Sequence, residues 1–351
     1  MSHFVQIHLL TPYAPSNLNR DDLGRPKTAV MGGTQRLRVS SQCLKRAWRT
    51  SDTFASALHG HVGTRTKEQG TKIEQDLIKA GRSAKDAREI AREIAKQFGA
   101  LDGDTANTKQ LVHFSPEELR ALDAVVQRFA TSGKPTEAEA KALRSTDPRA
   151  ADIALFGRML ADSPDCNADA AAQVAHAITV HETAVETDYF TAVDDLNDGS
   201  EDVGASHIGE TGFGAGVFYF YLCINRDQLL SNLGGDQALA QRTLRALLEA
   251  CAKVSPDGKQ NSFGARSWAS WIRVEHGDQP PRSLAAAFLQ PIKAGKDGVL
   301  ANAIAAAASW SQNLDNTYGP NTARAAELDV HKGTGSFAAL LDFVAQPLKE
   351  G

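Results

Sequence analysis

The sequence contains no long hydrophobic run and no segment typical of an export signal. Its most apolar stretch, near Gly216–Ile224, is far shorter than the roughly 20 residues that a membrane-spanning helix needs. The N-terminal segment MSHFVQIHLLTPYAP lacks the basic start and the extended apolar core of a signal peptide. These absences argue against a membrane or secreted protein, and we predict a cytoplasmic protein with no membrane partner.

Cysteine is scarce, and neither cysteine nor histidine occurs in a metal-binding pattern. The four cysteines form no C-x-x-C pair, which argues against a zinc ribbon and a disulfide framework. The histidine pairs His59/His61 and His176/His181 lack the spacing of metal ligands. The glycine-rich segment 209–216 (GETGFGAG) matches no phosphate-binding loop and is typical of a flexible loop or a bulge. We therefore predict no metal and no cofactor.

The chain also lacks an overall excess of positive charge, but it concentrates its basic residues in one place. It has 38 basic and 42 acidic residues, for a formal net charge of −4. Residues 18–49 contain eight of the basic residues and two of the acidic ones, so this segment is strongly positive within an acidic protein. Such a local excess predicts a binding site for a polyanion. The alternative is a solvated charged loop.

The basic residues of this segment fall on predicted regular elements. Alternation predicts a strand over Arg36–Val39, with Leu37 and Val39 facing the core and Arg36, Arg38 and Ser40 on the opposite face. Ser40 and Ser41 then cap a helix whose polar face carries Gln42, Lys45 and Arg49. A helix N-terminus flanked by cations favours phosphate, so we expect salt-dependent, sequence-independent binding of a nucleic-acid backbone.

The remaining pattern predicts an α+β protein. A strand over Phe4–Leu10 precedes the basic segment, and a charged helical block occupies about residues 66–145. The later segments are predicted as a short strand at Asp152–Met159, a strand at Val174–Glu186, a loop at Gly204–Gly216, a strand in GVFYFYLCIN, a helix at Asp236–Val254, a strand at Ser267–Glu275, and C-terminal helices including Val299–Leu314. Outside the helical block this order is the split β-α-β pattern of ferredoxin-like and RNA-recognition folds.

Several motifs, in order along the chain, resemble the CasC (Cse4) family, the backbone subunit of the type I-E CRISPR Cascade surveillance complex. They are LNRDD, AVMGG, QRLRVSSQCLKRAWR, ADIALFGRM, AHAIT, DYFTAVDDL and GVFYFY. The resemblance implies a non-catalytic protein that polymerises along a CRISPR RNA, kinks the guide at regular intervals and presents it for pairing with target DNA in antiviral defence.

The resemblance also implies an architecture like a hand. An RNA-recognition-motif-like palm (residues 1–54 and 191–351) would carry inserted helical fingers (55–150) and a β-hairpin thumb with its return (151–190). The implied partners are CRISPR RNA, the target DNA strand, further copies of the chain, and the large, small, 5′-handle-capping and 3′-hairpin endonuclease subunits of Cascade.

The resemblance assigns roles to particular residues. Met159 would wedge against a displaced base, and Tyr189, Phe190 and Val193 would pack around the same kink. The residues expected to hold the guide backbone, including Arg38 from the strand face, are Arg20, Lys27, Arg38, Ser40, Gln42, Lys45, Arg46 and Arg49.

The chain departs from the family pattern in two places. Tyr189 stands where relatives have tryptophan. The stretch that corresponds to a lysine-rich, duplex-gripping helix of the fingers mixes Lys134, Lys141 and Arg144 with two glutamates, Glu137 and Glu139.

Two alternatives remain open at the level of sequence. The first is a metal-dependent RNase of the kind found in type III backbone subunits, in which a loop aspartate cuts bound RNA; Asp21 or Asp22 would take that role here. The second is an RNA-binding subunit of an unrelated ribonucleoprotein, which the charge pattern alone would allow.

Overall fold

A computed structural model describes residues 3–160, 162–192, 207–320 and 323–347 of the chain. Its main sheet is antiparallel, with the strand order β11-β10-β1-β9-β7-β3-β2, and two further strands, β6 and β8, pair with β9. The strands are β1 (Phe4–Ser16), β2 (Thr28–Met31), β3 (Thr34–Val39), β6 (Ala172–Val174), β7 (Ala177–Thr179), β8 (Glu186–Ala192), β9 (His207–Asn225), β10 (Trp271–Gly277) and β11 (Arg324–Asp329).

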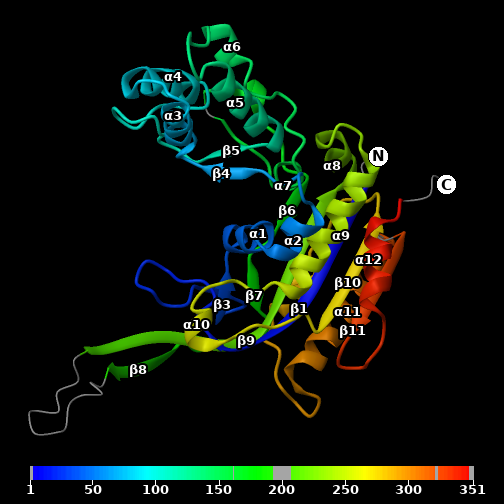
Figure 1. Cartoon of the computed structure of the whole chain (residues 1–351). Coiled ribbons are helices and arrows are strands. Elements are labelled where there is room, and N and C mark those ends of the chain that lie inside the picture. Colours follow the sequence, from blue (N-terminus) through cyan, green and yellow to red (C-terminus); the bar gives the residue numbers. More distant parts are fainter. Residues whose placement is uncertain (1–2, 161, 193–206, 321–322, 348–351) are drawn as a thin grey trace, which may run out of the picture.

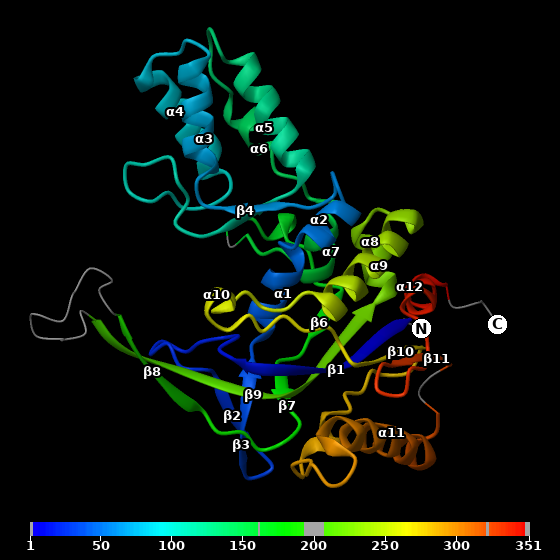
Figure 2. The same ribbon diagram turned by 60° about the horizontal axis from the view of Figure 1, so that its bottom comes forward.

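Helices cover both faces of this sheet (Figure 1, Figure 2). One face packs on α1 (Ser41–Arg49), α2 (Asp52–Ala57), α7 (Ala151–Phe156), α8 (Arg226–Asn232), α9 (Gln237–Lys253) and α12 (Phe337–Ala345). The other face packs on η2 (Ala285–Phe288) and α11 (Gly298–Tyr318), which Figure 2 shows across the sheet from α1 and α9. Strand β1 is therefore buried on both faces, so that even His8 is fully buried.

Between α2 and α7 the chain leaves the sheet and forms a separate helical lobe, residues 64–145, as the charged helical pattern predicted (Figure 1). It contains β4 (Thr64–Thr66), α3 (Gln69–Lys79), α4 (Ala84–Lys96), β5 (Val112–Phe114), α5 (Pro116–Arg128) and α6 (Glu137–Lys141). Its own small core includes Ile73, Leu77, Ile90, Ile94 and Phe114. The lobe can therefore hold its shape beside the sheet without covering it.

A long β-hairpin projects from the sheet on another side (Figure 1). Strand β8 pairs with the first part of β9, in register from Glu186↔Phe213 to Ala192↔His207. The second half of β9 runs on through the centre of the sheet beside β1. The hairpin was predicted within residues 151–190; the described part of that range instead holds α7, a 3-10 turn, β6, β7 and only the start of the hairpin.

Three sequence-based predictions of secondary structure are wrong. The strand predicted at Val174–Glu186 is not continuous, because β6 ends at Val174, β7 covers only Ala177–Thr179 and β8 begins at Glu186. Residues 204–216 were predicted as a glycine-rich loop, but Gly209, Gly214 and Gly216 lie in β9 because side chains cross the strand there. A Cβ atom would stand 2.4 Å from Phe190 Cζ at Gly209 and 2.8 Å from Leu37 Cδ1 at Gly214. The strand predicted at Asp152–Met159 is the helix α7, whose alanine-rich residues are buried against β6 and α9.

Candidate nucleic-acid interface

Helix α1 presents the N-terminus that the sequence predicted. The Ser40 side chain accepts a hydrogen bond from the Cys43 N–H at 3.3 Å, and the Ser40 N–H donates to Asn19 Oδ1 at 2.9 Å. Leu44 and Trp48 are buried, which turns the opposite face of the helix outward. No acidic residue occupies the first turn, so the positive end of the helix is not neutralised by its own sequence.

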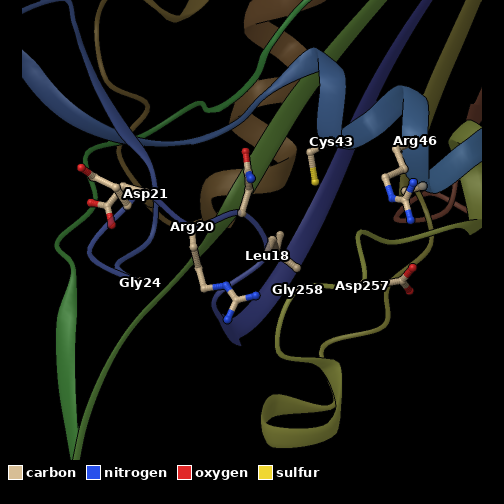
Figure 3. A pocket seen from close by; sticks show the side chains of 11 residues that line it. Leu18, Arg20, Asp21, Gly24, Cys43, Arg46, Asp257 and Gly258 are labelled. Carbon is tan, nitrogen blue, oxygen red and sulfur yellow. The ribbon is translucent and has the colours of Figure 1, made fainter. Parts of the chain in front are cut away.

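The loop before β2 closes against this helix and is anchored to the hairpin strand. Arg20 pairs with Pro26 in a short bridge, and the buried Asn17 donates to Gly24 O and to Gly212 O, both at 2.9 Å. The loop, α1 and the Asp257–Gly258 turn enclose a cavity of about 540 Å³ (Figure 3). The exposed side chains of Arg20 and Arg46 line it, so two predicted contacts are brought to one hollow.

A second group of cations consists of Lys27 before β2, Arg38 on β3 and Lys45 on α1. The Arg38 guanidinium lies 2.7 Å from His176 Nδ1. Burial, then Arg38 and Lys27, lower the pKa of His176, which means that the imidazole stays neutral beside two positive charges. Lys45 is half-buried with its ammonium 5.7 Å from the Phe156 ring centroid, and burial lowers its pKa. An anion placed here would relieve this mutual repulsion.

Arg36 and Arg49 are not part of this open surface. Arg36 is fully buried, and it donates to Thr179 O at 2.9 Å and to Phe288 O at 3.0 Å. The prediction that it lies on an exposed strand face is wrong, because the segment around η2 covers that face. Arg49 pairs with the buried Asp152 at 3.2 Å and also lies 3.3 Å from His113 Nε2, which ties α1 to the base of the helical lobe.

The three aromatic and apolar residues that the structure describes from the predicted kink set are all exposed. Met159 is 77% exposed, Tyr189 59% and Phe190 44%. Met159 follows α7 and lines a cavity with Leu111 of the helical lobe, whereas Tyr189 and Phe190 lie on β8 of the hairpin. Val193 lies outside the residues that the structure describes. Within one chain, the lobe and the hairpin lie on different sides of α1 (Figure 1).

The loop from Ser255 to Ser270 also contributes to the site, although no sequence pattern predicted it there. Gly258 sits so close to the first loop that a Cβ atom would lie 2.3 Å from Leu18 O. Lys259 adopts a left-handed backbone with φ of 53°, and Trp268 is 67% exposed beside the Lys253 ammonium. The sequence offered only a Pro-Asp-Gly turn here, and the tertiary structure brings the turn to the cavity.

One of the two acidic residues of the first loop, Asp21, has a structural role. Asp21 Oδ1 accepts hydrogen bonds from the N–H groups of Leu23 at 3.0 Å and Arg25 at 2.8 Å, and so shapes the loop. In the described ranges no group of three or more His, Cys, Asp or Glu residues is arranged to hold a metal ion. Within the same ranges, no helix combines the length and apolarity needed to cross a membrane.

The stretch expected to correspond to a duplex-gripping helix, α6, is largely committed to its own lobe. Glu139 caps α6 through Thr136 and pairs with Arg128 at 2.8 Å. The Arg144 guanidinium donates to the Ser163 hydroxyl. Helix α6 thus has two glutamates in its first turn and a single basic residue, Lys141, in its last turn.

Comparisons with known proteins give one family and a consistent set of structures. A family model described as "CT1975-like protein" matches residues 5–342. A solved chain from a "CRISPR RNA-guided surveillance complex, pre-nicking" is 32% identical with a TM-score of 0.85, over 97% of this chain and 99% of that one. A chain from a "CRISPR RNA-guided surveillance complex" is 28% identical with a TM-score of 0.62, over 97% and 98%. No curated protein matches the chain.

Proposed function

The chain belongs to the CT1975-like protein family and is a CasC-type backbone subunit that binds CRISPR RNA; from this premise we propose that it polymerises along the guide as the repeating subunit of a type I-E Cascade complex. The observation that carries the proposal is the similarity, over 97% of the chain, to a subunit of an RNA-guided surveillance complex. The resemblance to CasC predicted from the sequence is thereby confirmed.

We propose that the guide backbone runs along the outward side of α1. Arg20 and Arg46, which line the cavity together with Asp21, Asp22 and Asp257, and the N-terminal amides of α1 supply the positive full and partial charges at this site. Arg38, Lys27 and Lys45 extend the path with cations that face no acidic partner on α1 or β3. Phosphate oxygens satisfy such donors whatever the base, so the same surface serves every guide sequence.

We propose further that Met159, Tyr189 and Phe190 shape the guide. All three are exposed; Met159 follows α7 and lines a cavity with lobe residues, whereas Tyr189 and Phe190 lie on β8 of the hairpin. Displacing a base costs a few kcal/mol of lost stacking. Contact with an exposed apolar or aromatic side chain returns about 1–3 kcal/mol per base, so a wedge built from two neighbouring copies could hold one nucleotide out of the stack.

We assign the central strands β10-β1-β9-β7, with α1 and α9 on one face, to the RNA-recognition-like palm of the family. The antiparallel order and the two helical connections support this assignment. The helical lobe then corresponds to the fingers and the β8–β9 hairpin to the thumb. We propose target DNA, the other Cascade subunits and further copies of the chain as partners, as the resemblance to CasC implies.

We propose that the chain itself catalyses no reaction. Asp21, one of the two candidates for a loop nuclease, accepts hydrogen bonds at one carboxylate oxygen from two backbone N–H groups of its own loop. Incubating the assembled complex with complementary RNA and Mg²⁺ tests this directly. Evenly spaced cuts that disappear in Asp21→Ala or Asp22→Ala would establish the metal-dependent RNase instead.

The polymerisation proposal is tested by mass photometry of the subunit on CRISPR RNAs of two lengths. The longer RNA should carry more copies in proportion to its length, and a Lys45→Ala/Arg46→Ala variant should load poorly at physiological salt. A single copy on both RNAs would contradict the proposal. Co-purification of a CRISPR RNA with the large, small and handle-binding subunits from the native host would establish the type I-E assembly.

A further inference from the structure

The most exposed residue of the proposed wedge follows directly after one of the most buried charges in the molecule. Met159 is 77% exposed, whereas Arg158 is 5% exposed. The backbone on both sides of Met159 is fixed: Arg158 exchanges two hydrogen bonds of 3.0 Å with Ala168, and the Leu160 N–H donates to Asn167 Oδ1 at 2.6 Å. The exposed Met159 side chain is thus attached to a backbone segment that hydrogen bonds hold on both sides.

The Arg158 guanidinium is held by a buried carboxylate from the helical lobe. Its Nη1 donates to both oxygens of Glu118, at 2.7 and 2.9 Å. Its Nη2 and Nε donate to Cys166 O, and Nη2 also reaches Ser145 O at 2.8 Å. Both charged side chains are about 1% exposed. The planar guanidinium therefore ties two separate backbone segments, at Ser145 and Cys166, to helix α5.

Glu118 is in turn fixed by its own helix. It is the third residue of α5, and its carboxylate accepts from the Ser115 N–H at 2.8 Å as part of a capping box. The other oxygen accepts from the Ser145 N–H at 2.8 Å. A carboxylate with every oxygen occupied cannot change its conformation without breaking several hydrogen bonds, so it makes a rigid anchor.

The same network reaches helix α1. The His113 carbonyl lies 3.4 Å from Arg158 Nη1, and the His113 ring lies 2.8 Å from Asp152 Oδ2. Asp152 also pairs with Arg49 at the end of α1. A continuous polar chain, Arg49–Asp152–His113–Arg158–Glu118, therefore joins the phosphate-binding helix to the segment that carries Met159.

A buried ion pair is a poor way to gain stability, because desolvation cancels most of its attraction, but it defines geometry sharply. We propose that Glu118 and Arg158 are positioning residues for Met159: they hold its backbone at a fixed place relative to α1, so that the side chain meets the guide at a set distance from the bound phosphates. This inference rests on the proposed role of Met159 as a wedge.

The test uses the subunit assembled on guides that carry 2-aminopurine at one position at a time. Unstacked 2-aminopurine fluoresces strongly, so displaced nucleotides give periodic maxima. The variant Glu118→Gln/Arg158→Met keeps the volume and the capping acceptor but removes the charge pair and its fork of hydrogen bonds. We expect it to melt cooperatively and bind guide as the wild type does, but to lose the maxima to the level of Met159→Ala. Hydrogen exchange of the Leu160 amide should be faster in this variant.

A matched control is the exposed pair Arg149–Asp147, which lies between the lobe and α7, replaced as Arg149→Gln/Asp147→Asn; this variant should keep the maxima. If Met159→Ala loses the maxima while the folded pair variant keeps them, the positioning role is wrong and the wedge stands. If Met159→Ala keeps them, the wedge itself is wrong and the positioning role falls with it. Should the double variant not fold, Arg158→Lys provides the same test, because it keeps the charge and loses the fork.

Discussion

The basic residues of α1 have two different roles, an ion pair within the fold and binding of RNA. Replacing Arg49 by glutamine distinguishes these roles. The sequence grouped Arg49 with the residues that hold the guide, but the structure pairs it with Asp152, a carboxylate with no exposed surface. Arg46, three residues earlier on the same helix, is exposed and lines the cavity instead. Arg49→Gln should therefore act on stability, and Arg46→Gln on RNA binding.

The expected magnitude follows from burial. Removing one partner of a buried ion pair costs about 3–5 kcal/mol. Asp152 keeps its hydrogen bonds to the Gly63 N–H and His113, both at 2.8 Å, so we expect Arg49→Gln to lie near the lower end, about 3 kcal/mol. This is a large part of the roughly 5–15 kcal/mol that stabilises a typical domain. The loss should appear first where α1 meets the helical lobe.

Two measurements on the same preparations give the answer. Urea unfolding followed by tryptophan fluorescence reports stability, with the buried Trp48 next to Arg49 as a local probe; a loss of 3 kcal/mol lowers the midpoint by about 1 M. Anisotropy of a labelled single-stranded RNA at several salt concentrations reports phosphate contacts, each of which contributes about 0.7 to the slope of log K against log salt. Arg46→Gln should reduce the slope by that amount and change stability by less than about 0.5 kcal/mol.

The reasoning would be refuted by an Arg49→Gln protein with the wild-type urea midpoint and a salt slope reduced like that of Arg46→Gln. Asp152→Asn provides an independent check. If the two residues form a structural clamp, the double variant should be more stable than the sum of the single losses allows, because neither charge is left unpaired. Additive losses would show that the pair is not coupled.

Three further predictions follow from particular residues. Gly209→Ala should displace the Phe190 ring and weaken the periodic base displacement, with the fold retained; Ala215→Ser, exposed on the same strand, is its control. His276→Phe should make unfolding less sensitive to acid: burial lowers the folded pKa of His276 from 6.5 to about 4, so its stabilisation is complete above pH 6.5 and lost toward pH 4. Between pH 7.5 and 5 the wild type should lose about 2 kcal/mol more than the variant in urea titrations, and equal losses would contradict this. Gly70→Ala, whose Cβ would lie 1.9 Å from Ala106 O, should destabilise the helical lobe by about 1–3 kcal/mol, seen as a lower melting temperature.

The elements with local signals were predictable. Ser40 caps α1 where the sequence placed the cap, and Leu44 and Trp48 face the core at helical spacing. The strand predicted in GVFYFYLCIN is the second half of β9. Each of these signals acts within a few residues, so it is complete in the sequence.

The errors share a physical cause in contacts far along the chain. Glycines in β9 indicated a loop, but they are there because Phe190, Leu37 and Thr179 cross the strand. The short segment of α7 has too few residues for a clear period, and its burial against distant elements decided its conformation. The hairpin was predicted too early in the chain, within residues 151–190, for the same reason: its second strand lies in the glycine-rich stretch that was predicted as a loop.

The sequence by itself determined that this chain gathers positive charge near a capped helix, that a separate helical lobe follows, and to which family the chain belongs. Only the tertiary structure decided which charges are free. Arg36, Arg46 and Arg49 look alike over a window of a few residues, yet Arg36 meets carbonyls more than 140 residues away and Arg49 meets a carboxylate 103 residues away. A charge binds a ligand only where the fold leaves it unpaired and solvated, and that depends on partners that no local pattern contains.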